Sequence, residues 1–125
     1  MTRGKRITLW VTAIAMVIVG TLHFVHADEF VRIVPAFLPA PLALVYISGV
    51  AEIAGGLGLL VERTRRFAAW GLIALFVAVF PANINMAVNH IPLGGAPPWA
   101  AWARLPFQVL FIWVAWWLGR QRQTD

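Results

Sequence analysis

Four long apolar runs, separated by short polar segments, dominate the pattern of this chain. The first and third contain no charged residue, the second contains only Glu52, and the fourth contains only Arg104. Each run has about the 20 residues that an α-helix needs to cross a bilayer, and Arg104 lies near one end, where its guanidinium can extend to the interface. We therefore predict an all-α bundle of four transmembrane helices that forms one domain over residues 1–125. The predicted spans are residues 7–25, 42–61, 67–88 and 100–119.

Composition supports the membrane interpretation. Hydrophobic residues make up 61% of the chain and charged residues 12%, whereas soluble domains contain roughly 45–50% and about 25%. The absence of cysteine excludes disulfide scaffolds, thiol catalysis, iron–sulfur clusters and thiolate zinc sites. The net charge of +5 would suit a nucleic-acid partner. The basic residues lie in short clusters between apolar runs, as in membrane proteins, so we expect a lipid bilayer and no nucleic acid.

Lysine and arginine predict the orientation in the membrane. Eight of the ten basic residues fall on one side of a four-pass chain, and only Arg32 and Arg104 fall on the other. The positive-inside rule then places both termini and the basic turn between the second and third spans in the cytoplasm. The eight residues are Arg3, Lys5, Arg6, Arg63, Arg65, Arg66, Arg120 and Arg122.

Residues 1–27 also have features of a cleavable signal peptide, namely a basic start and a small residue at Ala27. The apolar run 7–25 is longer than the usual 7–15 residues of such a peptide. We therefore expect it to be retained as a span.

Both predicted outer loops are rich in proline, which limits helix continuation. In the first, Asp28 is a candidate N-cap for a short helix that ends at Pro35. The apolar residues of this loop could lie on the membrane surface or close the outer mouth of the bundle; they are Phe30, Ile33, Val34 and Phe37. The prolines are Pro35, Pro39 and Pro41 in the first loop and Pro92, Pro97 and Pro98 in the second.

Glu52 is the clearest candidate for chemistry, because it lies near the middle of the second span. A charge at that depth costs about 2.5–3.5 kcal/mol on insertion scales, so we expect the carboxyl to be protonated or paired. It could handle a proton or bind a ligand, or it could form an interhelical hydrogen bond that only fixes packing. Ser48 lies four residues earlier, on the same helical face.

Three asparagines follow Pro81 in the third span. Proline cannot donate to the carbonyl of Val77, so we expect the helix to kink or loosen there. Asn85 and Asn89 are four residues apart and share a face, and Asn85 is the deeper of the two. We favour Asn85 as a site residue and interpret Asn83 and Asn89 as local caps.

The remaining polar candidates lie in the outer halves of the first and fourth spans. His23 could act as a ligand or a proton relay, and Arg104 and Gln108 are four residues apart. Because the inner halves are almost wholly apolar, we predict a pocket open to the outside and closed toward the cytoplasm. We predict no metal site, since no His-x-x-x-His spacing occurs, His90 falls in a loop and acidic ligands are few.

Small residues of the second span let a neighbouring backbone approach closely. Ala51 and Gly55, and likewise Ala54 and Gly58, are spaced four apart. We expect packing within the bundle, with homo-oligomer formation as the alternative.

Several stretches resemble the DoxX-like family of small bacterial membrane proteins. They are His23-Phe24, Ile33-Val34-Pro35, Leu38-Pro39, residues 46–56 with Gly49 and Glu52, Pro81-Ala82-Asn83-Ile84-Asn85-Met86-Ala87 and Arg104-Leu105-Pro106-Phe107-Gln108. The resemblance covers roughly residues 20–118. It implies a four-helix bundle in the bacterial inner membrane and a link to quinone-coupled sulfur oxidation and redox homeostasis. It also implies that Glu52, Asn85, Arg104 and Gln108 are positions of recurrent polar motifs.

Two functions follow, and whether the chain is an enzyme stays open. It could be an accessory subunit of a quinone-linked oxidoreductase, in which Asn85 and Gln108 bind the quinone carbonyls and Glu52 or His23 supplies protons. A partner redox subunit would bring the electrons, because the chain has no ligand set for a haem or a metal and no covalently bound cofactor is expected. The alternative is a non-catalytic protein that binds a lipid-like ligand or helps to assemble another membrane protein. A transporter or channel would need an oligomer.

Overall fold

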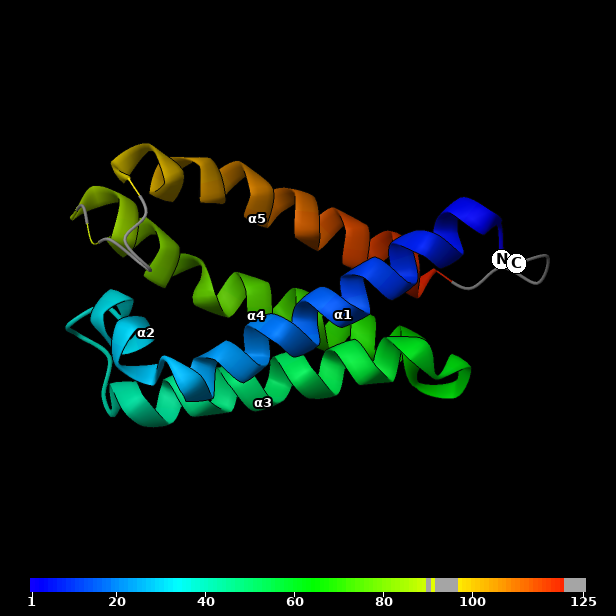
Figure 1. Ribbon diagram of the computed structural model, residues 1–125, viewed down its shortest axis with the longest axis horizontal. Helices are drawn as coiled ribbons and strands as arrows, with labels where there is room; N and C mark the ends of the chain where they lie inside the picture. Colours follow the sequence, from blue (N-terminus) through cyan, green and yellow to red (C-terminus); the bar gives the residue numbers. More distant parts are fainter. Residues whose placement is uncertain (90, 92–96, 121–125) are drawn as a thin grey trace.

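The structure is a computed structural model that describes residues 1–89, 91 and 97–120. It is all-α in this described part, and four of its five helices are long and apolar enough to cross a membrane (Figure 1). The chain is therefore a multi-pass membrane protein. The four long helices are α1 (Arg3–Val25), α3 (Pro41–Leu60), α4 (Glu62–Val88) and α5 (Pro98–Gly119), and the short helix is α2 (Ala27–Ile33).

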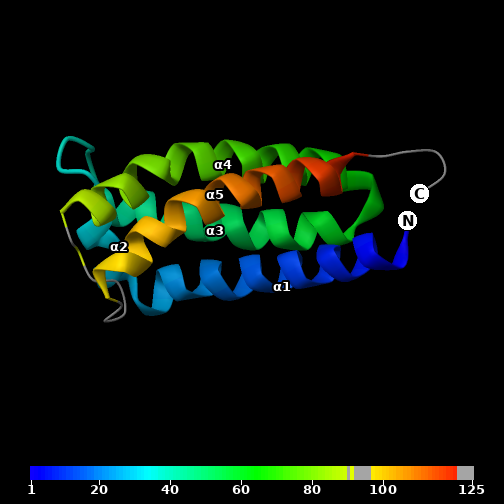
Figure 2. The same ribbon diagram turned by 90° about the horizontal axis from the view of Figure 1, so that it is seen from above.

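The long helices pack in sequence order, with α1 along α3, α3 along α4, and α4 along α5 (Figures 1 and 2). α1 begins and α5 ends at the same end of the bundle, where the Lys5 ammonium donates a hydrogen bond to the Arg120 carbonyl (2.9 Å). We call this the Lys5 end and the opposite end, which carries α2, the α2 end. α1 and α5 meet at the Lys5 end and diverge toward the α2 end (Figure 1). The bundle is therefore wedge-shaped.

The connection between α3 and α4 is shorter than the sequence predicts. Only Val61 separates the two helices, and the basic residues expected in a turn belong to the start of α4. The Thr64 hydroxyl and the Arg65 guanidinium donate hydrogen bonds of 2.8 and 2.7 Å to two carbonyls of the last turn of α3. These side chains satisfy carbonyls that a helix end otherwise leaves without partners. Because residues 63–66 are helical, the prediction that they form a turn was wrong.

Glycines bring α1 and α3 into backbone contact. A Cβ atom added to Gly20 would lie 2.7 Å from the carbonyl oxygen of Gly49, and one added to Gly56 would lie 2.9 Å from that of Ala13. Both distances are too short for any larger residue without a backbone shift. The two contacts are seven residues apart on each helix, which is about two turns, so they hold the helices together along one line.

The other face of α3 packs against α4 through Gly55 and Gly58, while Ala54 is exposed. A Cβ atom on Gly55 would meet the side chain of Leu72, and one on Gly58 would meet that of Ala68. The prediction that these glycines serve packing within the bundle is confirmed.

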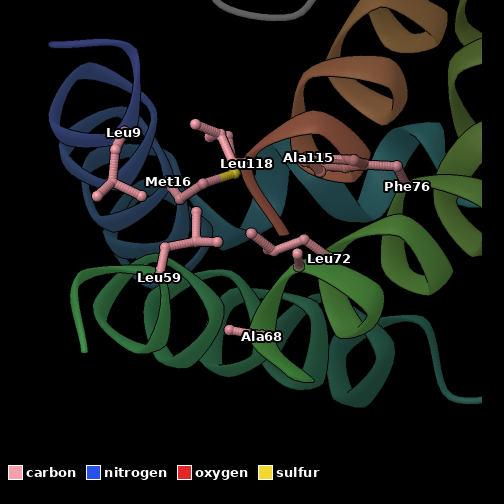
Figure 3. Close-up of a cluster of buried hydrophobic side chains, with 9 residues drawn as sticks. Leu9, Met16, Leu59, Ala68, Leu72, Phe76, Ala115 and Leu118 are labelled. Atoms are coloured by element: carbon pink, nitrogen blue, oxygen red, sulfur yellow. The ribbon is translucent and has the colours of Figure 1, made fainter. Parts of the chain in front are cut away.

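The main core fills the Lys5 end. Side chains from all four long helices meet there, and Met16 of α1 and Leu118 of α5 point toward each other (Figure 3). The cluster consists of Leu9, Met16, Leu59, Ala68, Ala69, Leu72, Phe76, Ala115 and Leu118. A second, smaller cluster joins α2 to α4 and α5 at the α2 end, and its buried members are Ile33, Met86, Ala87 and Ala101.

The short helix α2 begins earlier than predicted. His26 is its N-cap residue and makes no side-chain capping bond, while Asp28 lies in the first turn. Because α2 follows α1 after a single residue, no position remains for Asp28 to cap the helix, and that prediction was wrong. Its carboxylate still interacts favourably with the positive end of the helix dipole.

The apolar residues after α1 divide between the two locations considered for them. Ile33 is buried and Phe30 and Val34 are half-buried against the bundle, whereas Phe37 is 80% exposed. Helix α2 therefore covers the wide end of the wedge, and Phe37 in the following segment faces away from the bundle. His90 and Pro92 lie outside the described residues.

Candidate functional site

A cavity of about 720 Å³ lies in the wide part of the wedge. All five helices and the segment after α2 contribute to its lining, which is mainly apolar and includes Phe76, Phe107 and Phe111. Six polar side chains also belong to the described lining. They are His23, Ser48, Glu52, Asn83, Arg104 and Gln108.

Glu52 is the buried acid of this cavity. It lies near the middle of α3 and is only 7% exposed. Its Oε2 atom is buried and has no hydrogen-bond partner in the described part of the chain. A buried acceptor without a donor is costly, because burial removes the water that would otherwise bond to it. The carboxyl therefore has an unmet requirement that a ligand in the cavity can satisfy.

His23 is a polar neighbour of Glu52, with its Nδ1 atom 3.7 Å from Oε2. The same Nδ1 atom lies 2.8 Å from the Val19 carbonyl oxygen. A carbonyl can only accept, so Nδ1 carries the hydrogen and directs it to Val19 rather than to Glu52. The His23 ring also stacks on Phe30, with ring centroids 4.0 Å apart. This contact joins α1 to the short helix that covers the cavity.

Gln108 projects from α5 toward α4. It is 8% exposed, and its Nε2 atom donates a hydrogen bond of 2.9 Å to the Phe76 carbonyl. The residue therefore links two helices along the lining of the cavity. Pro81 lies inside α4 a little further along, and since proline has no amide hydrogen, the Val77 carbonyl beside Phe76 receives no bond from it.

Asn85, which the sequence favours over Asn83, lies outside the cavity lining. Its amide donates a hydrogen bond of 2.9 Å to the Ile33 carbonyl at the end of α2 and accepts one from Asn89. It therefore fastens the short helix to α4. Asn83 lines the cavity instead. Its spacing of seven residues from Phe76 puts both on one face of the helix, and this signal was available in the sequence.

Ser48 and Arg104 complete the lining. Ser48 is half-buried one turn before Glu52, and Arg104 reaches the cavity from α5 with an exposed side chain. The structure thus brings five of the six candidate residues to one cavity and leaves Asn85 beside it. Among the described residues, no group of three or more His, Asp or Glu side chains is placed to hold a metal ion.

Comparison with known proteins identifies a family for this chain. A family model described as a domain of unknown function, DUF8561, matches residues 12–119, which include most of all four long helices. No curated protein and no solved structure matches the chain.

Proposed function

The chain belongs to the family of the domain of unknown function DUF8561, and we propose that it binds a lipid-soluble ligand in the cavity at the α2 end. The proposal depends on one observation above all: a cavity of about 720 Å³ is lined by Glu52, whose buried Oε2 atom has no hydrogen-bond partner among the described residues. Sites for small molecules typically measure about 300–1,000 Å³ and combine apolar walls with a few polar groups. The lining described above has this character.

The arrangement of the helices supports a ligand that comes from the bilayer. α1 and α5 line the cavity from two sides, and they pack together toward the Lys5 end. Many apolar side chains of these two helices are exposed, as Ile18 and Phe107 are. We therefore expect an apolar ligand to enter the cavity from the bilayer, between these two helices.

A thermal-shift experiment tests this function. Purified protein in detergent micelles is heated with and without members of a series of lipid-soluble quinones and long-chain alcohols. Binding to the folded state raises the melting temperature as the ligand concentration exceeds its dissociation constant. Glu52→Leu should reduce the shift, while Glu62→Leu, the same change at the start of α4, should retain it. If no member of the series shifts the wild-type protein, the proposed function is wrong.

A second candidate is an accessory subunit of a quinone-linked membrane oxidoreductase. The resemblance of residues 20–118 to DoxX-like proteins favours it, as does the placement of Glu52 and His23 side by side in a cavity with aromatic walls. In this role a partner subunit supplies the electrons, and the carboxyl exchanges a proton with the quinone. Glu52→Gln retains hydrogen bonding but cannot exchange a proton. Quinone-dependent respiration of membranes that carry this variant should fall if the role is correct, and unchanged respiration would leave only ligand binding.

We propose that the protein lies in the inner membrane of a bacterium and that its Lys5 end faces the cytoplasm. Basic residues gather at this end, at the start of α1 and the start of α4, whereas Arg32 and Arg104 lie at the α2 end. Positively charged segments are retained on the cytoplasmic side. A green fluorescent protein fused to the C-terminus should then fluoresce, and alkaline phosphatase fused there should be inactive. The opposite pair of results would reverse the orientation and make the cavity open toward the cytoplasm.

A further inference from the structure

We propose that the ligand has a hydroxyl on an aromatic head, and that this hydroxyl binds the Oε2 atom of Glu52. The inference rests on the proposed function, because it names the chemical class that the same cavity selects. It starts from the hydrogen bonds that the neighbouring side chains already make.

Two donors that line the cavity with Glu52 direct a hydrogen elsewhere. His23 Nδ1, 3.7 Å from Glu52 Oε2, is 2.8 Å from the Val19 carbonyl oxygen, and Gln108 Nε2 donates one hydrogen to the Phe76 carbonyl. Within the described part of the chain, Glu52 Oε2 is the buried side-chain atom that is left without a partner. A molecule in the cavity can therefore supply the complementary group.

A hydroxyl fits this position better than the other common polar heads. It donates to an ionised carboxylate and can accept from a protonated carboxylic acid, so it satisfies Glu52 in either state. A ketone carbonyl can only accept, and it pairs only with the protonated acid. An ammonium group can only donate, and it would also meet the positive charge of Arg104, which lines the same cavity.

The walls favour an aromatic head. Phe30 stacks on His23, and Phe76 and Phe111 face each other with ring centroids 6.1 Å apart. All four residues line the cavity. Flat rings pack well against such surfaces, in stacked or tilted arrangements, so a phenol or a quinol fits the site better than an aliphatic alcohol of the same volume.

A pair of ligands separates the hydroxyl from the rest of the molecule. A long-chain para-alkylphenol and its methyl ether share the same ring and tail, but only the phenol can donate a hydrogen bond. Neither compound has to be oxidised or reduced for the measurement. Affinities are measured by isothermal titration calorimetry in micelles. The wild-type protein should bind the phenol about tenfold more tightly than the ether, as expected when a buried polar group loses its partner.

Variants then assign the preference to Glu52. Glu52→Leu should bring the two affinities to within about twofold, since the acceptor is gone. Glu62→Leu, which removes a carboxyl outside the cavity, should retain the tenfold preference. If Glu52→Leu does not fold, Glu52→Met, with a side chain of nearly the same length, takes its place.

The possible failures are distinguishable. Equal binding of phenol and ether to the wild-type protein would overturn the inference but leave the cavity as a site for lipid-soluble ligands. A preference that survives Glu52→Leu would also overturn it, because another residue would then recognise the hydroxyl. If neither ligand binds, while a quinone or an alcohol of the thermal-shift series does, the proposal that the ligand has an aromatic hydroxyl is wrong. If nothing in either series binds, the proposed function fails as well.

Discussion

The two ends of this bundle use the same four helices in opposite ways. At the Lys5 end, Leu59, Leu72 and Leu118 are almost completely buried in a cluster of apolar side chains, and the buried Lys5 donates a hydrogen bond to the Arg120 carbonyl. At the α2 end the helices diverge around a cavity that contains an acid, an imidazole and an amide. Met16 and Phe76 belong to the core and also line the cavity, so the boundary between the two regions falls at these residues.

The comparison shows how a small membrane protein can keep a costly group in its interior. Lipid is as apolar as leucine, so transmembrane helices associate through close packing rather than through a hydrophobic driving force. The Lys5 end provides this packing, helped by the Gly20–Gly49 and Ala13–Gly56 contacts between α1 and α3. The α2 end can then remain open and hold the Glu52 Oε2 atom, which has no hydrogen-bond partner in the part of the chain that the structure describes.

Removing a leucine from the packed region should have the largest effect on stability. Leu59→Ala leaves a void among side chains that cannot close it, and we expect a loss of about 2–5 kcal/mol in the free energy of unfolding. Leu44→Ala, in the lining of the existing cavity, should cost less than half as much. Unfolding by SDS in mixed micelles measures both. Equal losses would show that the two regions are packed alike.

Gly20→Ala should destabilise the contact between α1 and α3. The added Cβ atom would lie 2.7 Å from the Gly49 carbonyl oxygen, and overpacking of this kind costs about 1–3 kcal/mol. Gly71→Ala is the matched control, because a Cβ atom at Gly71 meets nothing within 4 Å. The control should be neutral or stabilising by up to about 1 kcal/mol, since alanine favours helix more than glycine. If the free energy of unfolding falls by a similar amount in the two variants, the close backbone contact between α1 and α3 does not contribute to stability.

Glu52→Leu should stabilise the protein when no ligand is present. It removes a buried acceptor that has no donor, so we expect the free energy of unfolding to rise by about 1–2 kcal/mol. The gain should disappear when a saturating ligand is added, because the wild-type carboxyl then has its partner. A large loss of stability without ligand would instead mean that Glu52 holds the helices together.

Asn85→Ala should have the smallest and most local effect. It removes the hydrogen bond to the Ile33 carbonyl, which is worth about 1 kcal/mol. Hydrogen–deuterium exchange of the α2 amides should accelerate, while exchange near Leu72 in the packed region stays unchanged. Unchanged exchange in α2 would show that its apolar contacts alone hold it in place.

The sequence predicted the spans well because the membrane imposes one strong rule on them. A backbone in lipid must satisfy its own hydrogen bonds, so long apolar runs become helices. The sequence also pointed to Glu52, since an acid in the middle of such a run is costly whichever way its side chain faces. These two inferences needed no knowledge of which helices touch.

Features that depend on contacts between helices were harder to predict. The choice of Asn85 over Asn83 rested on the face that Asn85 shares with Asn89, but the structure turns that face toward α2 and puts Asn83 in the cavity lining. The turn before α4 was expected to be longer, because the sequence does not show that Thr64 and Arg65 can satisfy the end of α3. The pairing of Gly20 with Gly49 depends on the register between α1 and α3, although the spacing of seven residues from Ala13 to Gly20 and from Gly49 to Gly56 was visible.

Cysteine accessibility tests the contrast between the two ends most directly. The natural chain contains no cysteine, so a single Ser48→Cys variant reports on the cavity and a single Ala115→Cys variant reports on the packed region. A small membrane-permeant maleimide should label Ser48→Cys rapidly in native membranes and leave Ala115→Cys unlabelled until the protein is unfolded. Equal and slow labelling of both would contradict the account, because the α2 end would then be as tightly closed as the Lys5 end.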